Sequence, residues 1–174
     1  MKKRILLPAF ALLLSQLSFA GNRSEATTIT LSDAPYFFAA KRHINNINMP
    51  NAAIAYNFDN HWAVEFGAGL INTNQRRFNQ HGIHGFLYTL DGLYRLDPHG
   101  ALEPYLLAGI GIMGLTPNGN DSEYQGNVNA GVGTQWFCDR SIALRGELRD
   151  VYTLHGGKND IMLNFGISFL FGGK

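Results

Sequence analysis

The chain has 174 residues, of which 45% are hydrophobic and 16% charged, and its formal net charge is +1. Proteins that bind nucleic acids usually need a clustered basic surface, so this balance argues against nucleic acid as a partner. The single cysteine, Cys138, excludes an internal disulfide framework and leaves either a free thiol, which we expect, or a bond to another chain.

The first 20 residues predict a secretory signal peptide. Residues 2–4 are basic, an apolar run follows, and small side chains precede an expected cleavage site before Gly21. A membrane anchor is the competing interpretation, but Pro8 and two polar residues interrupt the run, which falls short of the roughly 20 residues of a spanning helix. We therefore expect a signal peptide at 1–20 and one domain at 21–174. Without the leader, 14 − 3 = 11 basic residues face 13 acidic ones.

Beyond the leader, apolar residues alternate with small or polar ones at a period of two, which predicts β-strands separated by turns. The pattern predicts eight strands, in chain order 34–43, 50–57, 61–72, 82–96, 102–114, 124–137, 141–154 and 160–171. The connections alternate between tight turns ("FDN", "DPHGA", "CDR") and mostly longer polar loops at 43–50, 72–82, 115–124 and 155–159. Up-and-down hairpins would gather the tight turns at one end, as in transmembrane barrels of the bacterial outer membrane.

The two faces of the predicted strands differ in chemistry. One face carries the bulkier apolar residues: Trp62, Val64, Phe66, Ala68, Leu70, Phe86, Tyr88, Leu90, Tyr94, Leu106, Ala108, Ile110, Ile112, Val128, Ala130, Val132, Trp136, Ile142, Leu144 and Leu148. The other face carries small, polar and charged residues, and every charged residue in the middle of a strand is assigned to it. If this second face lines a closed barrel, no charge meets hydrocarbon.

A soluble β-sandwich or lipocalin-like barrel is the alternative, with the apolar face turned inward. That fold does not explain why the aromatic residues gather beside the tight turns and chain ends, where an interfacial girdle belongs. The predicted girdle consists of Tyr36, Trp62, Tyr94, Trp136, Phe169 and Phe171. We therefore predict an all-β protein, an eight-stranded antiparallel up-and-down transmembrane β-barrel.

The charged residues of the inner face form the main candidate site. They are Glu65, Asp91, Glu103, Arg145, Glu147 and Arg149. Because a buried charge without a partner is strongly disfavoured, we expect Arg–carboxylate pairs that fill the lumen, which in an eight-stranded barrel is just wide enough for side chains. The alternative is an ion-conducting gate in which the pairs exchange partners.

Other motifs carry weaker signals. "GIGIMG" (109–114) has the spacing of a dinucleotide site, but a loop follows where that site needs a helix, so we expect no cofactor. The loop histidines, of which only His81 and His84 are closely spaced, predict no metal site. Hydrolysis or acyl transfer would require Ser, His and a carboxylate in reach. The nearest hydroxyl is that of Ser122, and we expect no catalytic residue.

Three stretches resemble the OmpA-like family of small outer-membrane barrels: "LEPYLLAGIGI", "NAGVGTQWFCDRSIALRGELRDVY" and "NFGISFLFGG". The resemblance implies that Glu147 lies in the lumen with Arg145 or Arg149, and that Glu65 is a partner across the barrel. The closing strand is similar to the signal that the barrel assembly machinery recognises during insertion, here carried by Asn164, Gly166, Phe169 and Phe171. Because "GGK" follows that strand, we expect the barrel alone, without a peptidoglycan-binding domain.

These observations predict a monomeric protein of the bacterial outer membrane with both termini in the periplasm. Its expected partners are outer-membrane lipids, the assembly machinery, and host or surface ligands that contact the long loops. The expected role is structural or adhesin-like. A narrow porin, or a lipid A-modifying enzyme, remains the alternative.

Overall fold

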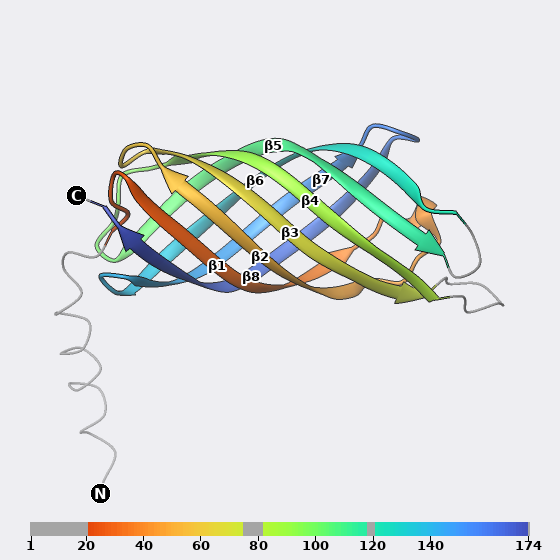
Figure 1. Ribbon diagram of the computed structural model, residues 1–174, viewed down its shortest axis with the longest axis horizontal. Helices are drawn as coiled ribbons and strands as arrows, with labels where there is room; N and C mark the ends of the chain where they lie inside the picture. Colours follow the sequence, from red (N-terminus) through yellow and green to blue (C-terminus); the bar gives the residue numbers. More distant parts are fainter. Residues whose placement is uncertain (1–20, 75–81, 118–120, 174) are drawn as a thin grey trace, which may run out of the picture.

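A computed structural model describes residues 21–74, 82–117 and 121–173. Its strands are β1 (Ala26–Phe37), β2 (Ile47–Asn57), β3 (Trp62–Asn74), β4 (Gly82–Arg95), β5 (Leu102–Pro117), β6 (Glu123–Asp139), β7 (Ile142–Thr153) and β8 (Lys158–Gly172), with a 3-10 turn, η1 (Ala40–Arg42), between β1 and β2. Each strand pairs antiparallel with its neighbours in sequence, and β8 pairs with β1, which closes a barrel (Figure 1). The predicted fold is confirmed.

The barrel has two unlike ends (Figure 1). One, called here the terminal end, holds the start of β1, the end of β8 and the connections 58–61, 96–101 and 140–141. The other, called the loop end, holds the connections 38–46 and 154–157, with the end of β3 and the start of β4. This separation of short turns from longer loops is the asymmetry that the sequence predicted.

The first strand differs from its predicted position. It runs from Ala26 to Phe37 instead of 34–43, and residues 40–42 form η1. The prediction missed residues 26–33, where the inward positions 28 and 30 are threonines and only Ile29 and Leu31 are large and apolar. β-Branched threonine favours strands, so this segment is a strand all the same. Most other strands extend past their predicted ends, so that β5, for example, continues to Pro117 within the loop predicted at 115–124.

Side chains alternate between the lumen and the outer wall. In β3, Ala63 and Glu65 are buried, whereas Trp62 and Phe66 are exposed. The apolar residues assigned to the outer face are all exposed or half-exposed, and Leu70 and Ile110 reach 66% and 62%. An apolar surface that encircles the whole molecule suits hydrocarbon and not water. Within the described residues, no helix is long and apolar enough to cross a bilayer.

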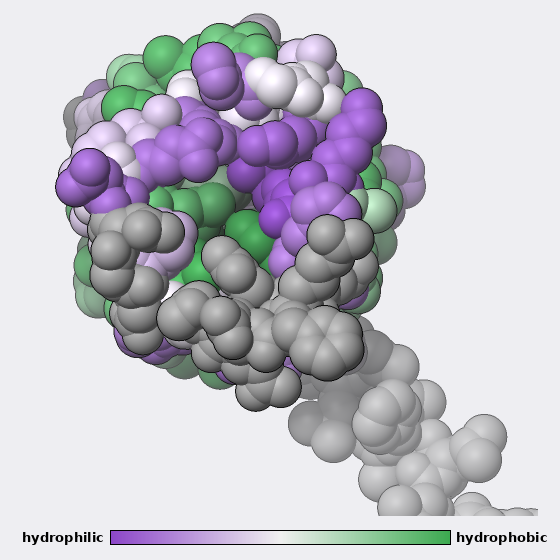
Figure 2. Space-filling view, turned by 90° about the vertical axis from the view of Figure 1, so that its right-hand side faces the viewer, coloured by the Kyte–Doolittle hydropathy of each residue, from purple (hydrophilic) through white to green (hydrophobic). Residues whose placement is uncertain are grey.

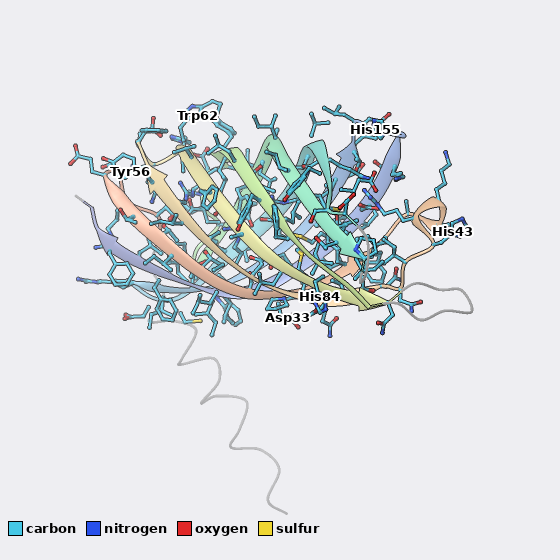
Figure 3. The ribbon with its side chains drawn as sticks, turned by 45° about the vertical axis from the view of Figure 1, so that its right-hand side comes forward. Asp33, His43, Tyr56, Trp62, His84 and His155 are labelled. Carbon is cyan, nitrogen blue, oxygen red and sulfur yellow. The ribbon has the colours of Figure 1, made fainter. Side chains whose placement is uncertain are left out.

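One outward carboxylate, Asp150, contradicts the prediction that charged residues in the middle of the strands face inward, and Asp33, just ahead of the predicted strand 34–43, lies outward as well. Asp33 in β1 and Asp150 in β7 are both exposed on the outer wall. Asp150 accepts a hydrogen bond from the neighbouring amide of Asn159. Asp33 lies opposite Pro50 on one side and Phe165 on the other, and Figure 3 places it between the two ends of the barrel.

One member of the predicted aromatic girdle is also misplaced. Tyr36 is fully buried, and its hydroxyl donates a hydrogen bond to Asp160 in the lumen near the loop end. The error follows from the wrong start of β1, which had put Tyr36 beside the terminal end. Trp62 and Tyr94 contact each other on the outer wall at that end, with ring centroids 4.9 Å apart.

The core of the molecule is the filled lumen, and its two halves differ. Near the terminal end, charged and polar side chains dominate, with small apolar clusters around Tyr105 and Phe137. Towards the loop end, apolar side chains form a cluster: Ala34, Tyr36, Phe38, Ile44, Met49, Ile71, Ile83, Leu87, Met113, Leu115, Val151 and Met162. The charged site therefore lies on the terminal-end side of an apolar layer that was not predicted from the sequence.

Candidate functional site

Arg145 on β7 is the centre of the charged site. Its guanidinium contacts Glu65 on β3 across the lumen, with Nη1–Oε2 and Nη2–Oε1 distances of 2.5 and 2.8 Å. Nη2 also donates to Glu147 Oε2 at 2.5 Å. The paired, two-bond contact with Glu65 fixes the plane of the guanidinium as well as its position. One arginine thus links two walls of the barrel.

Arg149 extends the site along β7. Its Nε donates to Glu147 Oε1 at 2.9 Å, and its Nη1 donates to Asp91 Oδ2 on β4 at 2.7 Å. A longer contact of 3.8 Å joins Nη2 to Glu65. Glu147 is therefore shared between two arginines that lie two residues to either side, on the same face of the strand.

Tyr105 connects a further strand, β5, to the network. Its hydroxyl donates to Glu147 Oε2 at 2.8 Å and accepts from Arg145 Nε at 2.7 Å. The ring lies against Gly133 on β6, where an added Cβ would collide with it. Glycine at 133 thus provides the space in which the tyrosine ring reaches the ion pairs.

A second group of polar residues fills the terminal end. Arg95 lies 3.6 Å from Glu103 and donates to the side chain of Asn57 at 2.9 Å. Asn22, ahead of β1, donates to Glu103 through both its backbone and its side-chain nitrogen, at 3.0 Å each. Glu103 therefore lies apart from the Arg145 network, with its own partners.

A third group closes the lumen at the loop end. Arg42 of η1 folds inward, and its Nη2 lies 2.9 Å from Asp160 on β8, with both side chains almost completely buried. Nη2 also donates to Thr153 at 2.5 Å, Nη1 donates to Gln125 at 2.9 Å, and Nε donates to Asp160 Oδ1 at 3.0 Å. The first loop is thereby attached to β6, β7 and β8.

All six charged residues predicted for the lumen are buried there, and five of them form one network while Glu103 forms a separate one. Three further lumen residues were not predicted: Arg95, Tyr105 and Asp160. Each lies on the inward-facing side of its strand and could have been found by extending the alternation. Arg42 had no such signal, because it belongs to a turn.

The space left beside this network is small. A cavity of about 20 Å³ is bordered by Glu65, Thr89 and Arg149. One water molecule needs about 10–15 Å³, so the cavity has room for one or two. The side chains themselves fill this level of the lumen.

The structure also shows where the glycine motif, the histidines and Ser122 lie. Residues 109–114 lie inside β5, which continues to Pro117 instead of opening a helix. His43, His84 and His155 are exposed towards the loop end (Figure 3), and His81 lies outside the described residues. Across the described ranges, no group of three or more His, Cys, Asp or Glu side chains is arranged to hold a metal ion. The hydroxyl of Ser122 hydrogen-bonds to Thr116.

The predicted assembly signal lies on both faces of β8. Asn164 is buried in the lumen and Gly166 half-buried, while Phe169 and Phe171 are directed outward near the terminal end. Recognition by the assembly machinery stays a prediction. So does the signal peptide, since residues 1–20 lie outside the described part of the chain.

Comparison with known proteins shows the family of this barrel. The sequence model of the OprF membrane domain matches residues 15–174. The chain belongs to the OprF membrane-domain family. This family consists of OmpA-like, eight-stranded outer-membrane barrels, so the predicted resemblance is confirmed. Its proteins are generally non-enzymatic structural proteins and porins. No protein of curated function matches the chain by sequence.

Solved structures agree with the OprF-type fold. The N-terminal barrel domain of Pseudomonas aeruginosa OprF has a TM-score of 0.66 and 19% identity, covering 86% of this chain and 100% of that one. OprG of the same organism gives 0.65 and 13%, with 87% and 98% covered. Ail of Yersinia pestis, solved with the heparin analogue sucrose octasulfate, gives 0.61 and 13%, with 85% and 99% covered. At these identities the likeness shows the fold alone.

Proposed function

We propose that this OprF-type barrel is a non-enzymatic structural protein of the bacterial outer membrane, with a lumen closed by charge pairs. In this proposal the leader is removed, the terminal end faces the periplasm, and the barrel is a monomer surrounded by outer-membrane lipids. The loop end then faces outward, where the connections can contact host or surface ligands. Its role is to maintain the membrane and to present these loops.

The observation that carries the proposal is the buried network of Arg145, Arg149 and three carboxylates. The network crosses the lumen from β7 to β3 and β4, and the cavity beside it has room for only one or two waters. An ion would have to break several charge-assisted hydrogen bonds to pass. A closed lumen favours a structural role over transport.

Single-channel recording tests this proposal. The mature protein is refolded into a planar bilayer and compared with Glu147→Ala, with Glu123→Ala, an exposed carboxylate at the loop end, as the control. We expect the wild type and the control to be silent. Steady wild-type conductance that changes with Glu147→Ala and not with Glu123→Ala would identify a gate instead.

A narrow porin is the second candidate, and two observations favour it. Arg149 lies within reach of three carboxylates, so it could exchange partners without leaving the lumen. The buried side-chain amides of Asn127 and Asn129 have no hydrogen-bond partner among the described residues, and such groups are normally satisfied by water. A wet path past Arg149 would begin there.

A further inference from the structure

The loop end contains a cavity that the charged network does not explain. It has a volume of about 340 Å³ and lies between η1 and the loop-end residues of β4, β5 and β6. Ile44, Ile83, Leu115 and Pro117 supply an apolar lining. Its volume is within the range of about 300–1,000 Å³ that is usual for small-molecule sites.

The floor of the cavity is apolar over some depth. Ile44, Ile83 and Leu115 belong to the apolar cluster of the upper lumen, and all three are buried. Figure 2 looks onto the loop end and shows hydrophobic residues in a hollow that hydrophilic residues border above and on the right. Water in such a cavity finds few hydrogen-bond partners, so an apolar molecule that displaces it gains free energy.

The polar residues at the rim limit what the occupant can carry. The guanidinium of Arg42 already donates to Asp160, Gln125 and Thr153, so it closes the lumen below and is not free to bind a ligand anion. The carboxylate of Glu123 is exposed and accepts from Gln125, and the imidazole of His43 is exposed. The rim therefore offers hydrogen bonds, without an uncompensated cation.

From this arrangement we propose that the cavity binds a small, mainly apolar molecule with one hydrogen-bonding group. The apolar body packs against Ile83 and Leu115, and the polar group reaches His43 or Glu123 at the rim. The site opens at the loop end and lies above the charge pairs, so binding requires no passage through the barrel. It is independent of whether the lumen conducts.

Methyl NMR of the full mature barrel in lipid nanodiscs tests the site, with indole as the probe. Indole has an aromatic body and one N–H donor. We expect saturable shifts of the Ile44, Ile83 and Leu115 methyl groups. The methyl groups of Ile110 and Leu148, on the outer wall, report partition into the bilayer and should shift without saturation.

Matched variants separate the cavity from the bilayer. Leu115→Trp should fill the cavity and weaken the saturable component at least tenfold, whereas Ile110→Trp, outward on the same strand, should leave it unchanged. Ile44→Asn makes the cavity polar from a loop position, so it remains informative if Leu115→Trp does not fold. Wild-type shifts that never saturate, or equal affinity in Ile44→Asn and the wild type, would overturn the proposal.

Discussion

Glu147 is the residue whose loss has the clearest predicted cost. It is buried between Arg145 and Arg149 and also accepts the Tyr105 hydroxyl. Glu147→Ala should lower the free energy of unfolding by about 3–5 kcal/mol, because it leaves two buried cations short of a partner. Urea unfolding in lipid vesicles measures the change. An unaltered midpoint would mean that the pairs do not support the fold.

Asp33 is a residue at which replacement should stabilise the barrel. Its carboxylate faces outward between Pro50 and Phe165, and no described side chain donates a hydrogen bond to it. Asp33→Leu should raise the unfolding free energy in a bilayer by about 1–2 kcal/mol, less than the cost of a lipid-facing Arg or Lys. Asp150→Leu, which loses the Asn159 hydrogen bond, is the comparison. No gain in Asp33→Leu would imply that this side chain reaches polar headgroups.

Asp59 should make a pH-dependent contribution at the terminal end. The backbone N–H groups of Trp62 and His61 both donate to its Oδ1 at 2.7 Å, and they lower the pKa of this exposed carboxyl. A lowered pKa in the folded state stabilises the fold above the ordinary pKa, and this contribution is lost as pH falls through the folded value. NMR titration of the carboxyl carbon should give a midpoint below about 3.9. A midpoint at or above that value would contradict the turn geometry.

At the scale of the strand, alternation decides which substitutions the membrane tolerates. Ala108 on β5 and Val132 on β6 lie outward and are neighbours through the pairing of these strands. Ala108→Arg or Val132→Arg should each impair insertion by about 2–4 kcal/mol near the midplane. Tyr124→Arg, exposed at the loop end of β6, is the control and should cost much less. Unchanged heat-modifiable folding in both test variants would contradict the lipid-facing assignment.

The strand scale also separates what the sequence could predict from what it could not. A period of two is a local property, so it predicted the faces of β3 to β7 and the burial of Glu65 and Arg145. It failed for β1, where threonines on the lumen side hide the apolar face. The contact between Arg42 and Asp160 joins residues 118 positions apart through a turn, and no local pattern reports such a contact.

At the scale of the whole molecule, the lumen is layered along its axis. From the terminal end to the loop end, the layers follow in this order: the polar groups around Glu103, the Arg145 network, the apolar cluster, and the contacts of Arg42 with Asp160. The sequence predicted the charged layer because its members alternate along strands. It did not predict the order of the layers, which depends on the register between strands as well as on position within each.

The pairing of β8 with β1 brings together the segments of the barrel that are farthest apart in the sequence. Thr30 and Ser168, 138 positions apart, are joined through their hydroxyls in this seam. Until β8 is present, β1 and β7 each keep an open edge whose backbone groups hydrocarbon cannot satisfy. Contacts of such long sequence separation also form slowly. We therefore expect membrane insertion to be completed in one late, cooperative step, after β8 has been delivered. A chain that stalls before β8 should remain a substrate for periplasmic proteolysis.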